Sequence, residues 1–102
     1  VTPQALFMMN SKLVQDEASR LAQRVLQDDI ETNADRINAL HEIVYGRVAT
    51  AEDIDKCNQF LQRYRKLSVN DMDDDGSAAA DLVVWQGLCR VLLAANEFAY
   101  LD

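Results

Sequence analysis

Aspartates crowd one short segment and give the chain its clearest potential for chemistry. Asp71, Asp73 and Asp75 alternate along the chain, and Gly76 follows them. Alternating carboxylates ahead of a turn-forming glycine supply the oxygen ligands that a hard cation such as calcium requires. The pattern resembles the front half of an EF-hand loop, D-x-D-x-D-G. Asp71, Asp73 and Asp75 are therefore the candidate calcium ligands.

The back half of the EF-hand pattern is missing. Its twelfth position is Leu82, which has no carboxylate to bind the ion with both oxygens, and Asp81 lies one residue too early. Segments between helices also commonly gather solvated aspartates, and carboxylates there favour the N-terminus of the helix that follows. The segment thus has two interpretations, a solvated connection and a weak calcium site, and the first is simpler.

The other residue types that commonly do chemistry are scattered. His41 is the only histidine and has no partner nearby in the sequence, so we expect a packing or capping role. Cys57 and Cys89 lack the C-x-x-C spacing of zinc and redox sites, which favours two buried thiols, with a disulfide as the alternative. The sequence contains no C-x-x-C-H, G-x-S-x-G, P-loop or G-x-G-x-x-G motif. It therefore names no catalytic or cofactor-binding residue.

Composition favours one helical domain. The chain has 102 residues, enough for a single core, and 49% of them are apolar. One proline and three glycines are few, which favours long helices over a turn-rich β fold. The chain begins at Val1 without a methionine, and we interpret it as the C-terminal piece of a larger multidomain protein.

Charge disfavours two classes of partner. The net charge of −7 repels phosphates, so we expect no nucleic acid binding. The basic residues Arg63, Arg65 and Lys66 fall at a predicted helix C-terminus, where cations complement the helix dipole. Residues 78–95 are apolar, but Asp81, Gln86 and Arg90 interrupt them, so we expect no membrane span.

Apolar residues at three-four spacing predict the elements that must position these groups. Four helices are expected over residues 11–27, 34–45, 51–66 and 78–95, and a shorter helix begins at Thr2-Pro3. The expected inner faces are Val14, Ala18, Leu21, Ala22 and Val25; Ile37, Leu40 and Val44; Ile54, Cys57, Phe60, Leu61 and Tyr64; and Trp85, Leu88 and Leu92 within the widest apolar arc. The helix at 78–95 is the expected centre of the fold, since its apolar arc is so wide.

Local signals set the expected helix boundaries. Gly46 is a natural left-handed stop, and Thr50 with Asp53 resembles a capping box. Asn96 is expected to end the last long helix. No strand-like alternation persists. The predicted fold is therefore all-α, a compact orthogonal bundle of four to five helices.

Three stretches of the sequence resemble a known family. They are residues 4–10 (QALFMMN), residues 36–54 with their Gly46-Arg47 turn and Thr50, and residues 88–102 (LCRVLLAANEFAYLD). Together they resemble the C-terminal part of the planctomycete-specific domain of unknown function, found in large planctomycete surface and cytochrome c-like proteins. Val48-Ala49 stands where that family usually has prolines, and Ala94-Ala95 where Asn-Ser is common. Neither departure threatens the fold.

The resemblance implies an exported parent protein and transfers no catalytic residue. It also implies cytochrome c-like modules upstream, so haem c is expected there and no cofactor in this segment. Arg47 is expected to pair with Asp102, Glu97 or a helix C-terminus.

The leading functional hypothesis is a helical accessory or interaction domain, without catalysis of its own, of an exported multidomain protein. Its partners would be other domains of the parent chain or a separate protein, and the chain itself would be a monomer or a weak homodimer. The alternative is a weak calcium-binding module at Asp71, Asp73 and Asp75. A third choice is part of an enzyme active site that upstream domains complete.

Overall fold

Helix α5 (Ala78–Tyr100) is the element on which the other described helices pack. In this computed structural model, which describes residues 3, 10–27, 29–68 and 78–100, α5 contacts each of the three remaining helices. Its largest contact is with α2 (Lys12–Val25). An apolar helix covered by several neighbours loses most of its water-exposed surface, which explains why its sequence is apolar almost all round.

Side-chain caps fix the start of α2 and of α3 (Asn33–Tyr45). The Ser11 hydroxyl accepts a hydrogen bond from the Val14 backbone amide at 3.1 Å. The Thr32 hydroxyl accepts one from the Asp35 backbone amide, also at 3.1 Å. Each cap satisfies a backbone donor that the first turn leaves free. Gly46 ends α3 in the left-handed conformation, with φ of 75°, as the sequence predicts.

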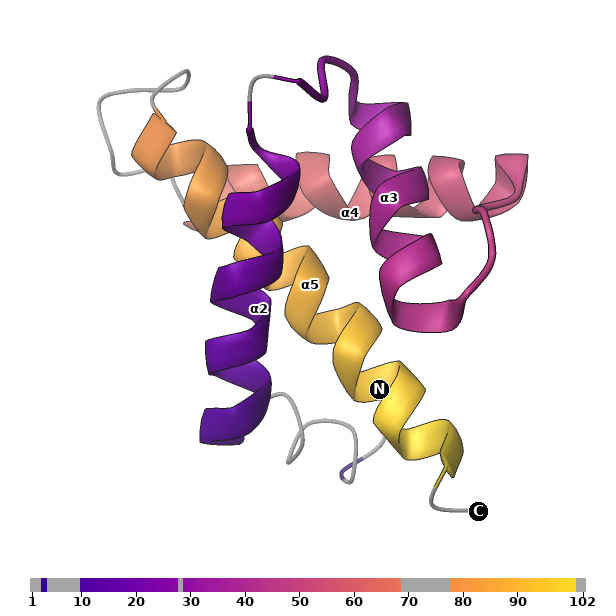
Figure 1. The fold of residues 1–102 in the computed structure, drawn as a ribbon. Coiled ribbons are helices and arrows are strands. Elements are labelled where there is room, and N and C mark those ends of the chain that lie inside the picture. Colours follow the sequence, from indigo (N-terminus) through magenta and orange to yellow (C-terminus); the bar gives the residue numbers. More distant parts are fainter. Residues whose placement is uncertain (1–2, 4–9, 28, 69–77, 101–102) are drawn as a thin grey trace.

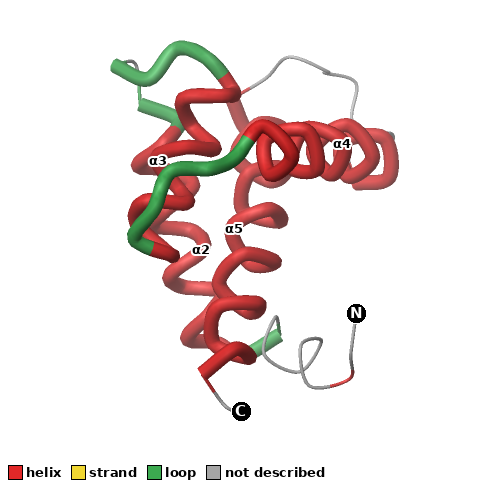
Figure 2. Tube along the Cα trace, turned by 90° about the vertical axis from the view of Figure 1, so that its right-hand side faces the viewer, coloured by secondary structure: helices red, strands yellow, loops and turns green. Residues whose placement is uncertain are grey.

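The capping box predicted at Thr50 is present at the start of α4 (Ala51–Ser68). The Asp53 amide donates to the Thr50 hydroxyl at 3.1 Å, and the Thr50 amide donates to Asp53 Oδ2 at 3.0 Å. Figure 1 shows α4 running across the directions of α2 and α3, and Figure 2 places α2 and α4 on different sides of α5. The predicted all-α bundle is confirmed, with four helices and no strand in the described part of the chain.

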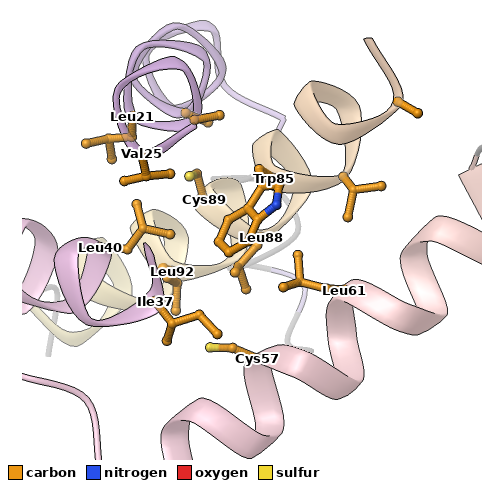
Figure 3. Close-up of a cluster of buried hydrophobic side chains, with 14 residues drawn as sticks. Leu21, Val25, Ile37, Leu40, Cys57, Leu61, Trp85, Leu88, Cys89 and Leu92 are labelled. Atoms are coloured by element: carbon orange, nitrogen blue, oxygen red, sulfur yellow. The ribbon is translucent and has the colours of Figure 1, made fainter. Parts of the chain in front are cut away.

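The core lies where the predicted inner faces meet (Figure 3). All five residues of the α2 stripe are buried, and Ile37, Leu40 and Leu61 join them from α3 and α4. Helix α5 contributes Trp85, Leu88 and Leu92, as predicted. Residues Ala78–Ala95 are long and apolar enough to cross a membrane by length and composition, with a mean hydropathy of 1.5, and 44% of them are buried against the other helices.

Several helix boundaries differ from the sequence prediction, and α2 ends at Val25 instead of residue 27. Helix α4 continues to Ser68, and α5 continues to Tyr100, so the prediction that Asn96 ends the last helix is wrong. Asn96 is compatible with a helix interior, and no glycine or proline follows it to stop the backbone. The predicted helix at Thr2-Pro3 falls largely on residues outside the described part.

Candidate functional site

A pocket of about 380 Å³ opens where α3, α4 and α5 meet, and we call it the α3–α4–α5 pocket. Its volume lies at the lower end of the range for small-ligand pockets. Its lining combines an apolar floor with a polar rim. The lining residues are His41, Tyr45, Arg47, Asp53, Lys56, Cys57, Phe60, Leu88, Val91 and Leu92.

His41 is the buried polar residue of this pocket, with 3% of its surface exposed. Its Nδ1 lies 2.9 Å from the Ile37 carbonyl oxygen, one helical turn earlier. Because a carbonyl can only accept, Nδ1 is the donor of this hydrogen bond. The His41 and Tyr45 rings pack edge to face, with 5.3 Å between their centroids. The Tyr45 hydroxyl donates a hydrogen bond to the Leu92 carbonyl at 2.9 Å. The packing role predicted for His41 agrees with these contacts.

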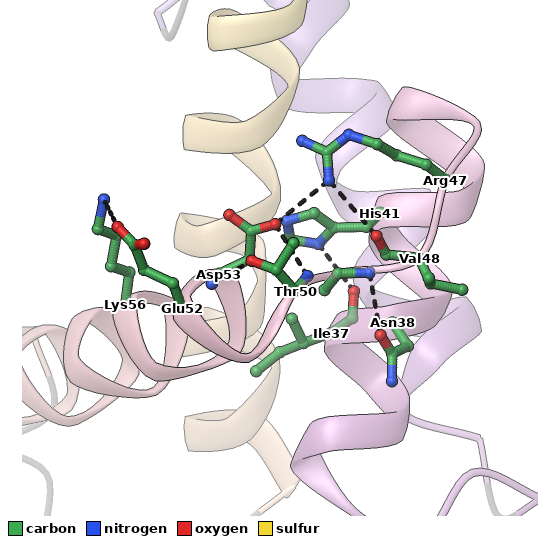
Figure 4. Close-up of polar contacts among 10 residues, drawn as sticks. Ile37, Asn38, His41, Arg47, Val48, Thr50, Glu52, Asp53 and Lys56 are labelled. Atoms are coloured by element: carbon green, nitrogen blue, oxygen red, sulfur yellow. Dashed lines mark hydrogen bonds and ion pairs between the residues drawn. The ribbon is translucent and has the colours of Figure 1, made fainter.

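The charged groups of the rim are paired with one another (Figure 4). Arg47 Nη1 lies 3.2 Å from Asp53 Oδ2, and Lys56 Nζ lies 3.0 Å from Glu52 Oε1. The Thr50 backbone amide, the Arg47 guanidinium and the Thr50 hydroxyl together lower the pKa of Asp53 to about 2. Asp53 is therefore ionised and engaged at neutral pH. Among the described side chains Arg47 thus pairs with Asp53, whereas the partners expected from the sequence were Asp102, Glu97 or a helix C-terminus.

Both cysteines are free and buried, which confirms the simpler of the two interpretations. Burial and the nearby Asp53 charge raise the pKa of Cys57 to about 11, and burial raises the pKa of Cys89 to about 12. A thiol must lose its proton to act as a nucleophile or a metal ligand. At neutral pH both groups therefore remain protonated and behave as small apolar side chains.

The structure brings together groups that the sequence keeps apart. His41, Asp53 and Cys57 line one pocket although they come from two helices, a proximity that only the crossing of α3 and α4 creates. The trio resembles a nucleophile with its base, but burial keeps the Cys57 thiol protonated, and among the described residues no hydrogen bond joins His41 to Cys57. Among the described residues no group of three or more histidines, cysteines and acidic residues is arranged to hold a metal ion.

The predicted calcium ligands Asp71, Asp73 and Asp75 lie outside the described residues. Calcium binding there stays a prediction. Millimolar calcium should raise the melting temperature, and Asp73→Ala should abolish that rise, because a ligand stabilises the state that binds it. Melting curves that calcium leaves unchanged would favour the solvated connection.

Comparison with known proteins identifies a family but no individual relative. The model of the family PSD1, described as a protein of unknown function (DUF1553), matches residues 1–61. This span includes α2, α3 and the first part of α4, and therefore the capping box and the Gly46 turn. No curated protein and no solved structure matches the chain.

Proposed function

This chain belongs to the PSD1 family of proteins of unknown function (DUF1553), and we propose that it acts as a non-catalytic helical interaction domain. The domain packs against other domains of its parent protein or against a separate protein partner. In this proposal the α3–α4–α5 pocket is the docking point and takes one large apolar side chain of the partner.

The observation that carries this proposal is an apolar floor surrounded by charges that already have partners. Phe60, Leu88 and Leu92 line the pocket, while Arg47 and Lys56 at its rim are paired with Asp53 and Glu52. Apolar or aromatic anchors that fill such pockets carry most of the binding energy of protein interfaces. Because the rim cations already have carboxylate partners within this chain, the partner protein need not supply a negative charge, and the side chain that enters the pocket can be neutral.

The groups that could do chemistry in the pocket favour binding over catalysis. Catalysis by a thiol requires a thiolate, and the raised pKa of Cys57 keeps its proton in place. A general base must lie within hydrogen-bond reach of the group it deprotonates; among the described residues no hydrogen bond joins His41 to Cys57, and Asp53 is engaged by the start of α4 and by Arg47. The functional assignment therefore rests on the shape and polarity of the pocket.

The wider setting is also a proposal. The sequence resemblance described above, together with the family match over residues 1–61, supports placement in the C-terminal part of the planctomycete-specific domain of an exported multidomain protein. Haem c-binding modules elsewhere in the parent belong to the same proposal. A C-x-x-C-H motif upstream in the parent's full sequence would support it, and a parent sequence without export signals would argue against it.

Peptide selection tests the docking proposal directly. A random peptide library is selected against the chain and counter-selected against Phe60→Ser, which removes an apolar wall of the pocket. We expect enriched peptides with a shared aromatic or large aliphatic anchor and micromolar affinity. Binding should fall at least tenfold in Phe60→Ser and persist in Leu13→Ser, a matched change at an exposed leucine of α2.

Circular dichroism establishes that both variants keep their helices. If the enriched peptides bind Phe60→Ser as well as the unchanged chain, the pocket is not the docking point. Turnover of a bound peptide or of an activated ester, lost in Cys57→Ser, would contradict the non-catalytic assignment.

A further inference from the structure

A second pocket, of about 360 Å³, lies between α2 and α5, and we call it the α2–α5 pocket. Polar side chains dominate its lining, in contrast to the α3–α4–α5 pocket. The lining residues are Gln15, Asp16, Ala18, Tyr64, Val83, Gln86 and Arg90. None of them contributes to the first pocket.

Arg90 is a half-buried cation that forms no ion pair with a carboxylate in the described part of the chain. Its Nη2 donates to the Tyr64 hydroxyl at 2.9 Å, and this neutral oxygen is its one hydrogen-bond acceptor among the described residues. Its Nε is buried and has no partner. A guanidinium withdrawn from water is costly unless an anion or several acceptors compensate it. The charge of Arg90 is therefore incompletely compensated.

Arg36 shows what compensation looks like in the same fold. This half-buried arginine also has no carboxylate partner among residues 10–27, 29–68 and 78–100, but its Nε donates to the Val25 carbonyl at 3.0 Å and its Nη1 to Asn33 Oδ1 at 3.3 Å. Its guanidinium also lies 5.9 Å from the ring centre of Trp85. Two hydrogen bonds and an aromatic face satisfy Arg36. Arg90 has one acceptor in a pocket with room for more.

Gly87 gives the α2–α5 pocket its shape. A Cβ at this position would lie 2.8 Å from the Tyr64 ring, so only glycine lets the ring approach α5 this closely. That approach places the Tyr64 hydroxyl against Arg90. Gln86 lies one turn before Arg90 on the same helix, lines the same pocket and forms no hydrogen bond with the described residues.

The geometry points to a carboxylate-binding site in the α2–α5 pocket, with Arg90 as its cation and the Gln86 amide as a second donor. The two terminal nitrogens of a guanidinium match the two oxygens of a carboxylate. Asp16 also lines the pocket; its Oδ2 lies 3.2 Å from Lys12 Nζ, which partly neutralises its charge, and the remaining repulsion disfavours dianions such as phosphate more than monoanions. The carboxylate comes from a free organic acid or from an acidic side chain of a protein.

Melting temperatures in added carboxylate test this site, at pH 7 and constant ionic strength set with sodium chloride. The probes are sodium propionate, the blocked amino acid N-acetyl-aspartate methylamide and inorganic phosphate. We expect the first two to raise the melting temperature by a few degrees at concentrations well above their Kd. If propionate binds more tightly, the natural ligand is a free organic acid; if the blocked aspartate binds more tightly, it is an acidic side chain of a protein. Phosphate should bind at least fivefold more weakly.

Three variants locate the binding. Arg90→Gln should lose the rise in melting temperature caused by carboxylate. Arg90→Lys should weaken carboxylate binding at least threefold, since a lysine keeps the charge but lacks the two terminal nitrogens that match the two carboxylate oxygens. Arg63→Gln, which removes an exposed cation of α4, should keep it. No response in the unchanged chain, an equal response in Arg90→Gln or phosphate binding as tight as propionate would each overturn the carboxylate site.

Discussion

The two pockets of this domain differ in how their charges are satisfied. At the α3–α4–α5 pocket, Arg47 and Lys56 are each paired with a carboxylate of the same chain. At the α2–α5 pocket, Arg90 has a neutral hydroxyl as its acceptor, and its Nε has none. A pocket whose charges are satisfied internally favours an apolar occupant, and a pocket with an unpaired cation favours an anion. Similar volumes in one small bundle can thus serve different ligands.

Removing the apolar floor of the first pocket should have the largest effect. Leu88 is 2% exposed and lies between the pocket and the core, so Leu88→Ala should lower the free energy of unfolding by about 2–5 kcal/mol. Urea unfolding followed by circular dichroism measures the change. Leu13→Ala, at a leucine 69% exposed, should change stability by less than about 0.5 kcal/mol. Equal losses in the two variants would contradict the assignment of Leu88 to the core.

Adding one methyl group should disturb the second pocket. Gly87→Ala places a Cβ against the Tyr64 ring, and crowding outweighs the gain in helix propensity, for a net loss of about 1–2 kcal/mol. Carboxylate binding should weaken as Tyr64 moves. Gly46→Ala is the control, because it strains a left-handed residue that does not line the α2–α5 pocket and should lower stability without affecting carboxylate binding. If Gly87→Ala binds carboxylate as tightly as the unchanged chain, the position of Tyr64 does not contribute to the carboxylate site.

Acid should reveal the engagement of Asp53. Its folded-state pKa of about 2 lies below the ordinary 3.8, so its contribution to stability is present above about pH 4 and is lost as the pH falls towards 2. Asp53→Asn should remove this part of the pH dependence. Urea midpoints between pH 2 and 5 measure it. If the urea midpoint falls equally steeply with decreasing pH in the variant and in the unchanged chain, Asp53 is not held by Thr50 and Arg47.

Replacing the unpaired cation should have the smallest effect on stability. Arg90→Met loses one hydrogen bond but also an incompletely compensated charge, so its free energy of unfolding should stay within about 1 kcal/mol of the unchanged chain. Arg36→Met should lose about 1–2 kcal/mol, because two hydrogen bonds and a contact with Trp85 disappear. Calorimetric melting compares the two. A larger loss in Arg90→Met would show that Arg90 is already satisfied.

Local signals explain how far the fold could be predicted from the sequence. The α2 stripe, the Gly46 stop and the Thr50 capping box depend on residues within one or two turns, and each is present in the structure. The end of α5 was mispredicted because Asn96 is a weak signal without a following glycine or proline.

The pockets could not be predicted in the same way. His41 and Asp53 face one pocket because α4 crosses α3, and no local pattern encodes that crossing. In the sequence Arg90 is only one of the polar residues that interrupt an apolar segment, whereas in the structure Tyr64 approaches from α4 and the two side chains line the α2–α5 pocket. Only the presence of a glycine three residues before an arginine in an apolar helix could have drawn attention to this place in advance.

A paired titration followed by nuclear magnetic resonance tests the contrast between the pockets most directly. Indole serves as the apolar aromatic probe and sodium propionate as the carboxylate, each added to the same isotope-labelled chain. Indole should shift signals of Tyr45, Cys57 and Phe60, and propionate should shift the Arg90 guanidinium and the Gln86 amide. If both probes shift the same signals, or propionate leaves Arg90 unchanged, the distinction between the two pockets is wrong.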